Sequence, residues 1–245
     1  TQVFMIKSLA EMPTWRRAFL NSFSKANMPL DAMAGLYNGL VKQSGLEVSE
    51  YQPWLARLIK EHRYMQAYVT WAQLIPENQR KYLGNVFDGG FEVPQEEQFG
   101  NFAWITRHSQ GVQMYWARSR GVVGETAFLV NFDGGRTPFS NLQQLLVLPP
   151  GKWHLNYRAK ANRLDSERGL IWRISCLDNG STLAETSPMR GMFDWQEFSL
   201  EFSIPAECGG QSLTLMIPAR IAAETQIQGD LWLDEVSIQP TETKL

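Results

Sequence analysis

The chain has 245 residues, of which 44% are hydrophobic and 20% charged, and its net charge at pH 7 is -2. This length suits one large domain or two small ones. The lack of a long basic run argues against nucleic-acid binding, and no apolar stretch approaches the roughly 20 residues of a membrane-spanning helix. The sequence starts at Thr1 without a signal-like segment, so we expect a fragment or a processed form of a longer protein.

The first third of the sequence carries helical patterns. Apolar residues recur at spacings of three and four, as in the stripe formed by Trp54, Leu55, Leu58 and Ile59. The patterns predict four helices, at 13–25, 29–43, 49–62 and 64–74. Because the turns between them are brief, we expect neighbouring helices to pack antiparallel.

The third and fourth predicted helices form a pair. A Leu-rich helix, a short turn at His62 and Arg63 and an Ala-bearing helix follow one another. This arrangement is similar to a tetratricopeptide-type helical hairpin, although the sequence lacks the clean self-repeat of roughly 34 residues that a repeat array would show. The alternative is a helical extension that packs on the following domain. In both cases we expect the Trp, Tyr and Met residues in the core rather than at a ligand.

The sequence changes character at the phrase Phe87-Asp-Gly-Gly-Phe-Glu-Val-Pro94. Beyond it, short alternating runs are broken by Gly, Pro, Asn and Asp, which is typical of strands and turns. Trp153, Leu155 and Tyr157, for example, alternate with polar residues, so that one face is apolar. About ten such runs predict an all-β sandwich. The expected strands include 104–107, 112–116, 126–132, 141–148, 153–160, 170–176, 197–204, 213–217 and 230–238.

Polar residues on these strands indicate a candidate binding face. Arg158 and Arg173 lie on successive predicted strands, and Gln144 lies on the strand before them. If these three side chains lie on the same face of one sheet, they form the polar floor of a concave surface. Alternatively, they are solvated residues of an outer face.

The two cysteines, Cys176 and Cys208, both fall in the β-rich part. Neither belongs to a Cys-x-x-Cys pair, so a zinc site is not expected. They form either a disulfide, if the protein is exported, or two separate buried thiols. The nine tryptophans should mainly fill the core, with one or two exposed as stacking platforms for a ligand.

Four phrases in the β-rich part occur in a set order. They are NVFDGGFE at 85–92 with Trp104 after it, LLVLPPGKWHLNYRAK at 145–160, DWQEFSLEFSIP at 194–205 and GDLWLDEVSI at 229–238. Together they resemble the jelly-roll carbohydrate-binding modules of the galactose-binding-like superfamily, particularly the xylan- and glucan-binding group. The resemblance implies the fold rather than a ligand, because that superfamily binds sugars, peptides, lipids and proteins on one scaffold.

The resemblances imply an α+β chain in two parts. A helical, tetratricopeptide-like segment would occupy residues 1–82, and a jelly-roll β-sandwich would occupy residues 83–245. This layout also resembles the C-terminal part of bacterial proteins that carry tetratricopeptide-like repeats and are linked with envelope or exopolysaccharide systems. It therefore implies a periplasmic or cell-envelope location.

The resemblance to carbohydrate-binding modules also implies a structural calcium ion. Family members often hold calcium with the Glu of the opening phrase and the Asp of the closing strand, which are Glu92 and Asp234 in this sequence. Calcium takes six to eight oxygen ligands, some of them carboxylates. Asp88 departs from the family pattern, which has a small residue or Asn there. Alternatively, Glu92 and Asp234 are ordinary carboxylates at strand ends. No other cofactor is expected.

The sequence offers no catalytic motif. It lacks the nucleophile-elbow, zinc-protease and P-loop patterns. His62, His108 and His154 do not have metal-ligand spacing. Asp234 and Glu235 are neighbours on a predicted strand and should point to opposite faces, so they cannot flank one glycosidic bond. We therefore expect a protein that is not an enzyme.

Our first hypothesis is a non-catalytic carbohydrate-binding module joined to a helical interaction segment. Trp104 and Trp116 would stack on sugar rings, and Arg158, Arg173 and Gln144 would bind sugar hydroxyls or an acidic sugar's carboxylate. The second hypothesis is a scaffold whose helices bind a protein partner and whose sandwich is structural. A third is an accessory domain of a hydrolase.

Overall fold

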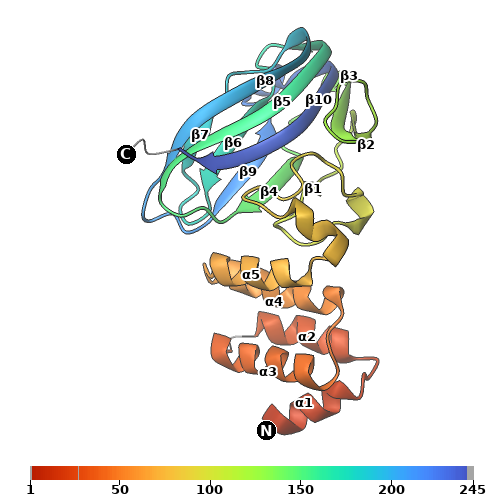
Figure 1. Cartoon of the computed structure of the whole chain (residues 1–245), viewed down its shortest axis with the longest axis vertical. Helices are drawn as coiled ribbons and strands as arrows, with labels where there is room; N and C mark the ends of the chain where they lie inside the picture. The colour runs from red at the N-terminus through yellow and green to blue at the C-terminus, as the bar shows by residue number, and fades with distance from the viewer. Residues whose placement is uncertain (1, 27, 242–245) are drawn as a thin grey trace. The chain divides into compact units, whose positions relative to one another are not determined.

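In the described residues of the computed structural model, the N-terminal part consists of five helices (Figure 1). They are α1 (Gln2–Ala10), α2 (Arg16–Lys25), α3 (Leu30–Gln43), α4 (Val48–Lys60) and α5 (Tyr64–Leu74). The helices from α2 to α5 confirm the four that the sequence predicted. Helix α1 was not predicted because its apolar residues form no single stripe: Val3 and Phe4 are exposed, whereas Leu9 is buried.

A buried ion pair connects the elements of the helical part. The Arg16 guanidinium donates to Glu50 Oε2 at 3.0 Å and to the carbonyls of Gly45 and Leu9 at 2.6 and 3.2 Å. Arg16 and Glu50 are only 2% and 5% exposed. Because the guanidinium bonds to the end of α1, the loop between α3 and α4, and α4 itself, it fixes their relative positions.

The structure describes residues 2–26 and 28–241, and the chain divides into two compact units, residues 1–74 and 75–245. The segment 75–82, which the sequence placed with the helices, thus opens the second unit as the 3-10 helix η1 (Glu77–Tyr82). Among the described residues, no helix is long and apolar enough to cross a membrane. The tetratricopeptide-like character of the helices stays a prediction.

Two antiparallel five-stranded sheets form the second unit and confirm the predicted β-sandwich. The first sheet has the order β1-β4-β9-β6-β7 and the second has the order β2-β3-β10-β5-β8 (Figure 1). The strands are β1 (Ile105–Thr106), β2 (Val112–Ala117), β3 (Ala127–Arg136), β4 (Leu142–Leu146), β5 (Gly151–Ser166), β6 (Ile171–Cys176), β7 (Thr182–Glu185), β8 (Gly191–Ile204), β9 (Gln211–Met216) and β10 (Gln226–Pro240). Two further 3-10 helices are η2 (Gln95–Glu97) and η3 (Ala222–Thr225).

The inward faces of both sheets supply one apolar core. On β5, Trp153, Leu155 and Tyr157 are buried while the residues between them are partly exposed, so the predicted alternation is confirmed. Tyr157 meets Trp172 of the opposite sheet edge to face, with ring centroids 6.4 Å apart. The chain changes sheets from β4 to β5 and again from β5 to β6. The strand β5 is therefore not a neighbour of β4 or β6, and its polar residues do not share a sheet with those of β4 and β6.

Candidate functional site

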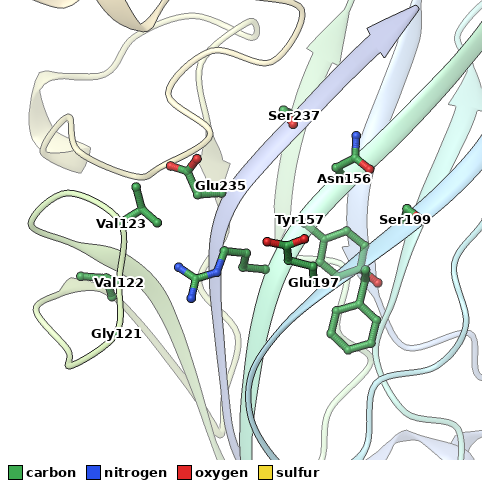
Figure 2. Close-up of a pocket in the computed structure, with 11 residues that line it drawn as sticks. Gly121, Val122, Val123, Asn156, Tyr157, Glu197, Ser199, Glu235 and Ser237 are labelled. Atoms are coloured by element: carbon green, nitrogen blue, oxygen red, sulfur yellow. The ribbon is translucent and has the colours of Figure 1, made fainter. Parts of the chain in front are cut away.

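A groove of about 950 Å³ lies on the outward face of the second sheet. Its floor is formed by polar side chains of three adjacent strands, and the loop 121–123 forms one wall (Figure 2). The polar floor residues are Asn156 and Arg158 on β5, Glu197 and Ser199 on β8, and Glu235 and Ser237 on β10. We call this surface the sheet groove.

Strand register brings the floor residues together. Arg158 lies opposite Glu197 on one side and Asp234 on the other, and Asn156 lies opposite Ser199 and Ser237. Between Asp234 and Ser237 the strand β10 contains a bulge, and Glu235 there has a φ of 53°. Bulges redirect side chains and often lie next to functional sites. This bulge lets Glu235 and Ser237 line the same groove.

Two carboxylates hold the loop 121–123, which we call the wall loop, and the residues that directly follow it. Glu92 Oε1 accepts hydrogen bonds from the backbone N–H groups of Glu125 and Thr126, at 2.9 and 3.2 Å. Asp234 Oδ2 accepts one from the N–H of Val123 at 2.8 Å. Charge-assisted bonds of this kind are stronger than neutral ones. The two acidic residues therefore fix the loop that closes one side of the groove.

Trp195 supports the same wall. Its indole Nε1 donates to the carbonyl of Arg120 at 2.9 Å. Gly121 has a φ of +84°, and a Cβ at this position would lie 2.7 Å from Trp195 Cδ1. Only glycine satisfies both constraints. Trp195 also lies under the Arg158 guanidinium, 5.3 Å from its ring centroid, within the range of a cation–π contact.

The polar floor residues differ in whether their side chains bond to other residues of the chain. Arg158 Nη1 lies 3.8 Å from Asp234 Oδ2, a long ion pair. Within the described parts of the chain, the side chains of Asn156, Glu197, Ser199, Glu235 and Ser237 have no hydrogen bond or ion pair. These groups therefore remain available for a ligand.

Burial raises the pKa of Asp234, which bonds to the wall loop, and of Asp88 in the opening segment of the sandwich. Desolvation raises the pKa of Asp234 to about 6, although the N–H groups of Val123 and Glu235 and the charge of Arg158 counteract it. Desolvation likewise raises the pKa of Asp88 to about 7, against hydrogen bonds from Val93 and Glu92. Both groups thus change charge close to neutral pH.

Two of the predicted sugar-binding residues are in the core, so their assignment was wrong. Trp104 is 3% exposed, stacks on Phe91 at 5.1 Å and donates from Nε1 to the carbonyl of Asp88. Gln144 is 1% exposed, and its amide bonds to the N–H and C=O of Phe87 at 2.8 and 2.9 Å. Gln144 thus satisfies backbone groups that burial would otherwise leave unpaired.

The other predicted residues do not share a surface. Arg158 lies in the sheet groove, but Arg173 lies on β6 of the first sheet, where Glu185 binds it at 2.6 Å. The prediction that both arginines share one floor was therefore wrong, because β5 and β6 belong to different sheets. Trp116 lines a separate pocket of about 340 Å³ beside β2.

Trp195 is the residue that sequence reasoning missed. The alternation of side chains along β8 indicates its position. Phe198, Leu200 and Phe202 alternate with Glu197, Ser199 and Glu201, and extending the same alternation backwards places Trp195 on the outward face. The strand predicted from this alternation began at residue 197, so it did not include Trp195.

The predicted calcium ligands lie near each other at the wall loop. A Cβ built on Gly90 would be 3.7 Å from Glu92 Cγ and 3.9 Å from Asp234 Oδ1, so both side chains approach the same turn. Glu92 Oε1 and both Asp234 oxygens accept backbone N–H groups. Glu92 Oε2 has no such bond among the described residues. The carboxylate of Glu235 approaches the same turn, since its Oε1 would lie 3.4 Å from a Cβ on Gly90. These carboxylates can supply charge to a cation, which takes six to eight oxygen ligands.

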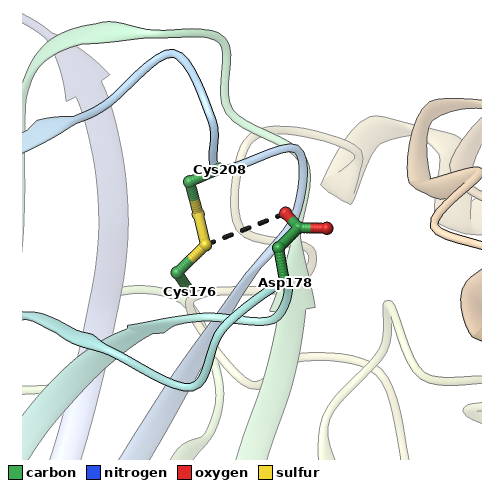
Figure 3. A group of neighbouring side chains, drawn as sticks. All are labelled: Cys176, Asp178 and Cys208. Atoms are coloured by element: carbon green, nitrogen blue, oxygen red, sulfur yellow. Dashed lines mark hydrogen bonds between the residues drawn. A yellow bond between two sulfur atoms is a disulfide. The ribbon is translucent and has the colours of Figure 1, made fainter.

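Cys176 and Cys208 form a disulfide, which decides between the two alternatives that the sequence left open. Figure 3 shows the bond beside Asp178, whose Oδ2 lies 3.8 Å from Cys176 Sγ and accepts the N–H of Gly209 at 2.7 Å. The two cysteines and Asp178 lie close enough together for a metal site. Because metals bind thiolates and not disulfide sulfurs, this cluster is structural.

No protein-family model matches the chain, and no curated protein matches it in sequence. Solved structures show similarity to its sandwich. A family 4 carbohydrate-binding module (CBM4) has a TM-score of 0.45 at 14% identity, covering 64% of this chain and 99% of the module. The CBM22-1 xylan-binding domain of Paenibacillus barcinonensis Xyn10C has a TM-score of 0.41 at 13% identity, covering 63% and 93%.

A similar degree of likeness extends to an enzyme. The Stig cyclase Fisc from Fischerella sp. TAU has a TM-score of 0.40 at 15% identity, covering 64% of this chain and 97% of the cyclase. Identities and TM-scores this low establish neither a family nor a ligand for this chain.

Proposed function

We propose that the sheet groove binds a carbohydrate chain without cleaving it. The observation that carries this proposal is the set of polar floor side chains without internal partners: one amide, two hydroxyls and two carboxylates in a groove of about 950 Å³. Sugar hydroxyls both donate and accept hydrogen bonds, and these groups offer both functions. Trp195 adds an aromatic ring beside Arg158 at the edge of the floor.

The charges in the groove favour an uncharged sugar over an acidic one. Glu197 and Glu235 line the groove, and Asp234 lies next to Arg158, the one basic residue that the described part of the chain contributes to the lining. The carboxylates outnumber the guanidinium, so a uronic acid would meet net repulsion. We therefore infer that Arg158 binds hydroxyls rather than a carboxylate, which narrows the choice that the sequence left open.

The experiment that tests the proposal is a glycan array with the purified chain, followed by calorimetry on the glycans that bind. Asn156→Ala should weaken binding by about tenfold, the effect of losing one hydrogen bond of roughly 1.4 kcal/mol. Arg173→Ala is the matched control, since it removes a strand arginine from the other sheet and should leave binding unchanged. A blank array, or equal losses in both variants, would reject the groove as a sugar site.

The same sugars provide the test for catalysis. After long incubation with the chain, chromatography should recover bound oligosaccharides intact. Cleavage that Glu197→Gln or Glu235→Gln abolishes would show that the groove is an active site instead.

We propose a periplasmic or cell-envelope location, supported by the disulfide between Cys176 and Cys208. Disulfides persist in oxidising compartments and are rare in the cytosol. Alkylation of cells under denaturing conditions, before and after reduction, tests this. Full labelling of both cysteines without reduction would contradict it.

A protein-interaction role of the helical unit is the second candidate function, because large apolar side chains are exposed there. Phe4 is 76% exposed, Met65 56% and Trp15 50%. If the helices bind a protein partner, Trp15→Ser should abolish that binding and leave glycan binding intact. The converse pattern, with partner binding lost in Asn156→Ala, would place the partner at the groove.

We also propose that Glu92 and Asp234 bind a structural calcium ion. The ion would stabilise the wall loop, because both carboxylates already hold it. Only the ionised carboxylates bind calcium, and the pKa of Asp234 is raised to about 6. Calcium should therefore raise the melting temperature more at pH 8 than at pH 5, and Glu92→Gln should remove the effect. An unchanged melting temperature at pH 8 with millimolar calcium would reject the site.

A further inference from the structure

Strand β2 is an unpaired edge of the second sheet and carries no charged residue, proline or bulge of the kind that usually protects such edges. It pairs with β3 on one side, and its other side has no neighbouring strand in the described structure. Its sequence, Val-Gln-Met-Tyr-Trp-Ala, contains no charged residue and no proline. Natural proteins normally block edges with lysine, proline or bulges, and an unblocked edge is a template for another strand. The opposite edge strand, β8, carries Asp194, Glu197 and Glu201.

The backbone of β2 presents free hydrogen-bonding groups at this edge. The N–H of Asp133 bonds to the carbonyl of Gly111 at 3.1 Å, which marks Gly111 and Asp133 as a hydrogen-bonded pair. In an antiparallel ladder such pairs alternate, so Gln113 and Tyr115 also bond to β3. Met114 and Trp116 then direct their N–H and C=O groups outward, and no partner for these groups occurs among the described residues.

A pocket of about 340 Å³ lies along this edge. Met114, Tyr115 and Trp116 form one side, and the segment 94–96 forms the other. Tyr115 is 47% exposed, and Met114 and Trp116 pack against the core, so the pocket has an apolar wall on a rigid support. This volume is sufficient for one apolar side chain of a bound strand.

The charges around the pocket indicate which strand would fit. Glu92 and Glu96 line it, whereas no lysine or arginine of the described residues does. A second copy pairing through β2 would bring its own Glu92 and Glu96 to the same interface, which like-charge repulsion disfavours. A basic segment gains attraction from Glu96, which is not among the proposed calcium ligands.

We propose that the edge of β2 binds an extended peptide segment that carries lysine or arginine, by adding it as a sixth strand to the second sheet. Main-chain bonds to Met114 and Trp116 would give affinity, and the pocket would select one apolar side chain. Glu96 would contact the basic residue. This surface is distinct from the sheet groove, so its test does not depend on sugar binding.

The test begins with a displayed library of random eight-residue peptides, selected on the whole chain. We expect enrichment of peptides that alternate apolar residues with at least one lysine or arginine. Met114→Pro removes an outward N–H, a change that edge strands tolerate, and should weaken the selected peptides by at least tenfold. Met114→Val keeps the N–H and is the matched control. Glu96→Gln should weaken the peptides severalfold.

Hydrogen exchange distinguishes strand addition from other binding. A bound peptide should slow amide exchange at Met114 and Trp116 and leave Gln113 and Tyr115 nearly unchanged, since these two already bond to β3. Methylating the peptide's own alternate amide nitrogens should abolish binding.

Three results would overturn the proposal. The first is no enrichment over a selection on Met114→Pro, or enriched peptides that bind this variant equally well. The second is an oligosaccharide that protects the β2 pocket, which would make it a sugar site. The third is a concentration-dependent dimer, seen by sedimentation and lost in Met114→Pro, which would make a second copy the occupant.

Discussion

The helical unit and the β-sandwich are stabilised in different ways. In the helical unit, the ion pair of Arg16 and Glu50 joins three elements from inside. In the sandwich, a continuous apolar core and the disulfide between Cys176 and Cys208 do this work. Arg158 and Arg173 of the sandwich lie on its outer faces and are partly exposed. A buried arginine thus has a structural role here, whereas an arginine on an outer face is open to a ligand only where its sheet carries the groove, as for Arg158.

The strongest test of this comparison is Arg16→Ala. The change would leave Glu50 buried without its partner, which typically costs about 3–5 kcal/mol. We expect the free energy of unfolding of the helical unit to fall by that amount in urea denaturation followed by circular dichroism. Arg17→Ala is the control, because Arg17 is exposed on the same helix. Similar losses in both variants would show that the buried pair is not what joins the helices.

Removing the disulfide should have a slightly smaller effect, confined to the sandwich. The two cysteines are 32 residues apart, and closing a loop of that length stabilises a fold by about 3–4 kcal/mol in the chain-entropy treatment. The variant with Cys176→Ala and Cys208→Ala should lose this amount in denaturant unfolding monitored by tryptophan fluorescence. Unchanged unfolding would mean that the apolar core alone sets the stability of the sandwich.

The stability of the sandwich should fall as the pH rises from about 4 to about 7. Burial raises the pKa of Asp88 to about 7 and of Asp234 to about 6, from an unperturbed value of 3.8. In this window the folded chain binds more protons than the unfolded chain, so the free energy of unfolding decreases with pH. Thermal melts across this range measure it. Asp234→Asn should flatten the profile near pH 6, and a profile as steep as the parent's would exclude Asp234 as its source.

The smallest effects on stability should come from the two surface arginines. Arg158→Ala and Arg173→Ala remove partly exposed ion pairs, which contribute roughly 0–1 kcal/mol. Their effects on glycan binding should differ, with about a tenfold loss for Arg158→Ala and none for Arg173→Ala. Isothermal titration and thermal melting of both variants check this. A large fall in melting temperature for Arg158→Ala would make Arg158 a structural partner of the buried Asp234.

Much of this molecule follows from local patterns in the sequence. Apolar spacing predicted α2 to α5, since each helix buries one face. Alternation predicted β5 and its polar residues Asn156 and Arg158, because side chains on a strand point to opposite faces. The same kind of alternation in β8 also places Trp195 on the outward face. These features depend on neighbours within a few residues.

Tertiary structure alone decided which strands share a sheet. The alternation of side chains along a strand shows which residues share one side of that strand. For Gln144, Arg158 and Arg173, it does not show which sheet of the sandwich each strand joins. Because β5 lies in the second sheet and β4 and β6 in the first, only Arg158 reaches the sheet groove. The buried positions of Trp104 and Gln144, the disulfide and the open edge of β2 likewise arise from contacts between distant segments. Local periodicity carries no information about such contacts.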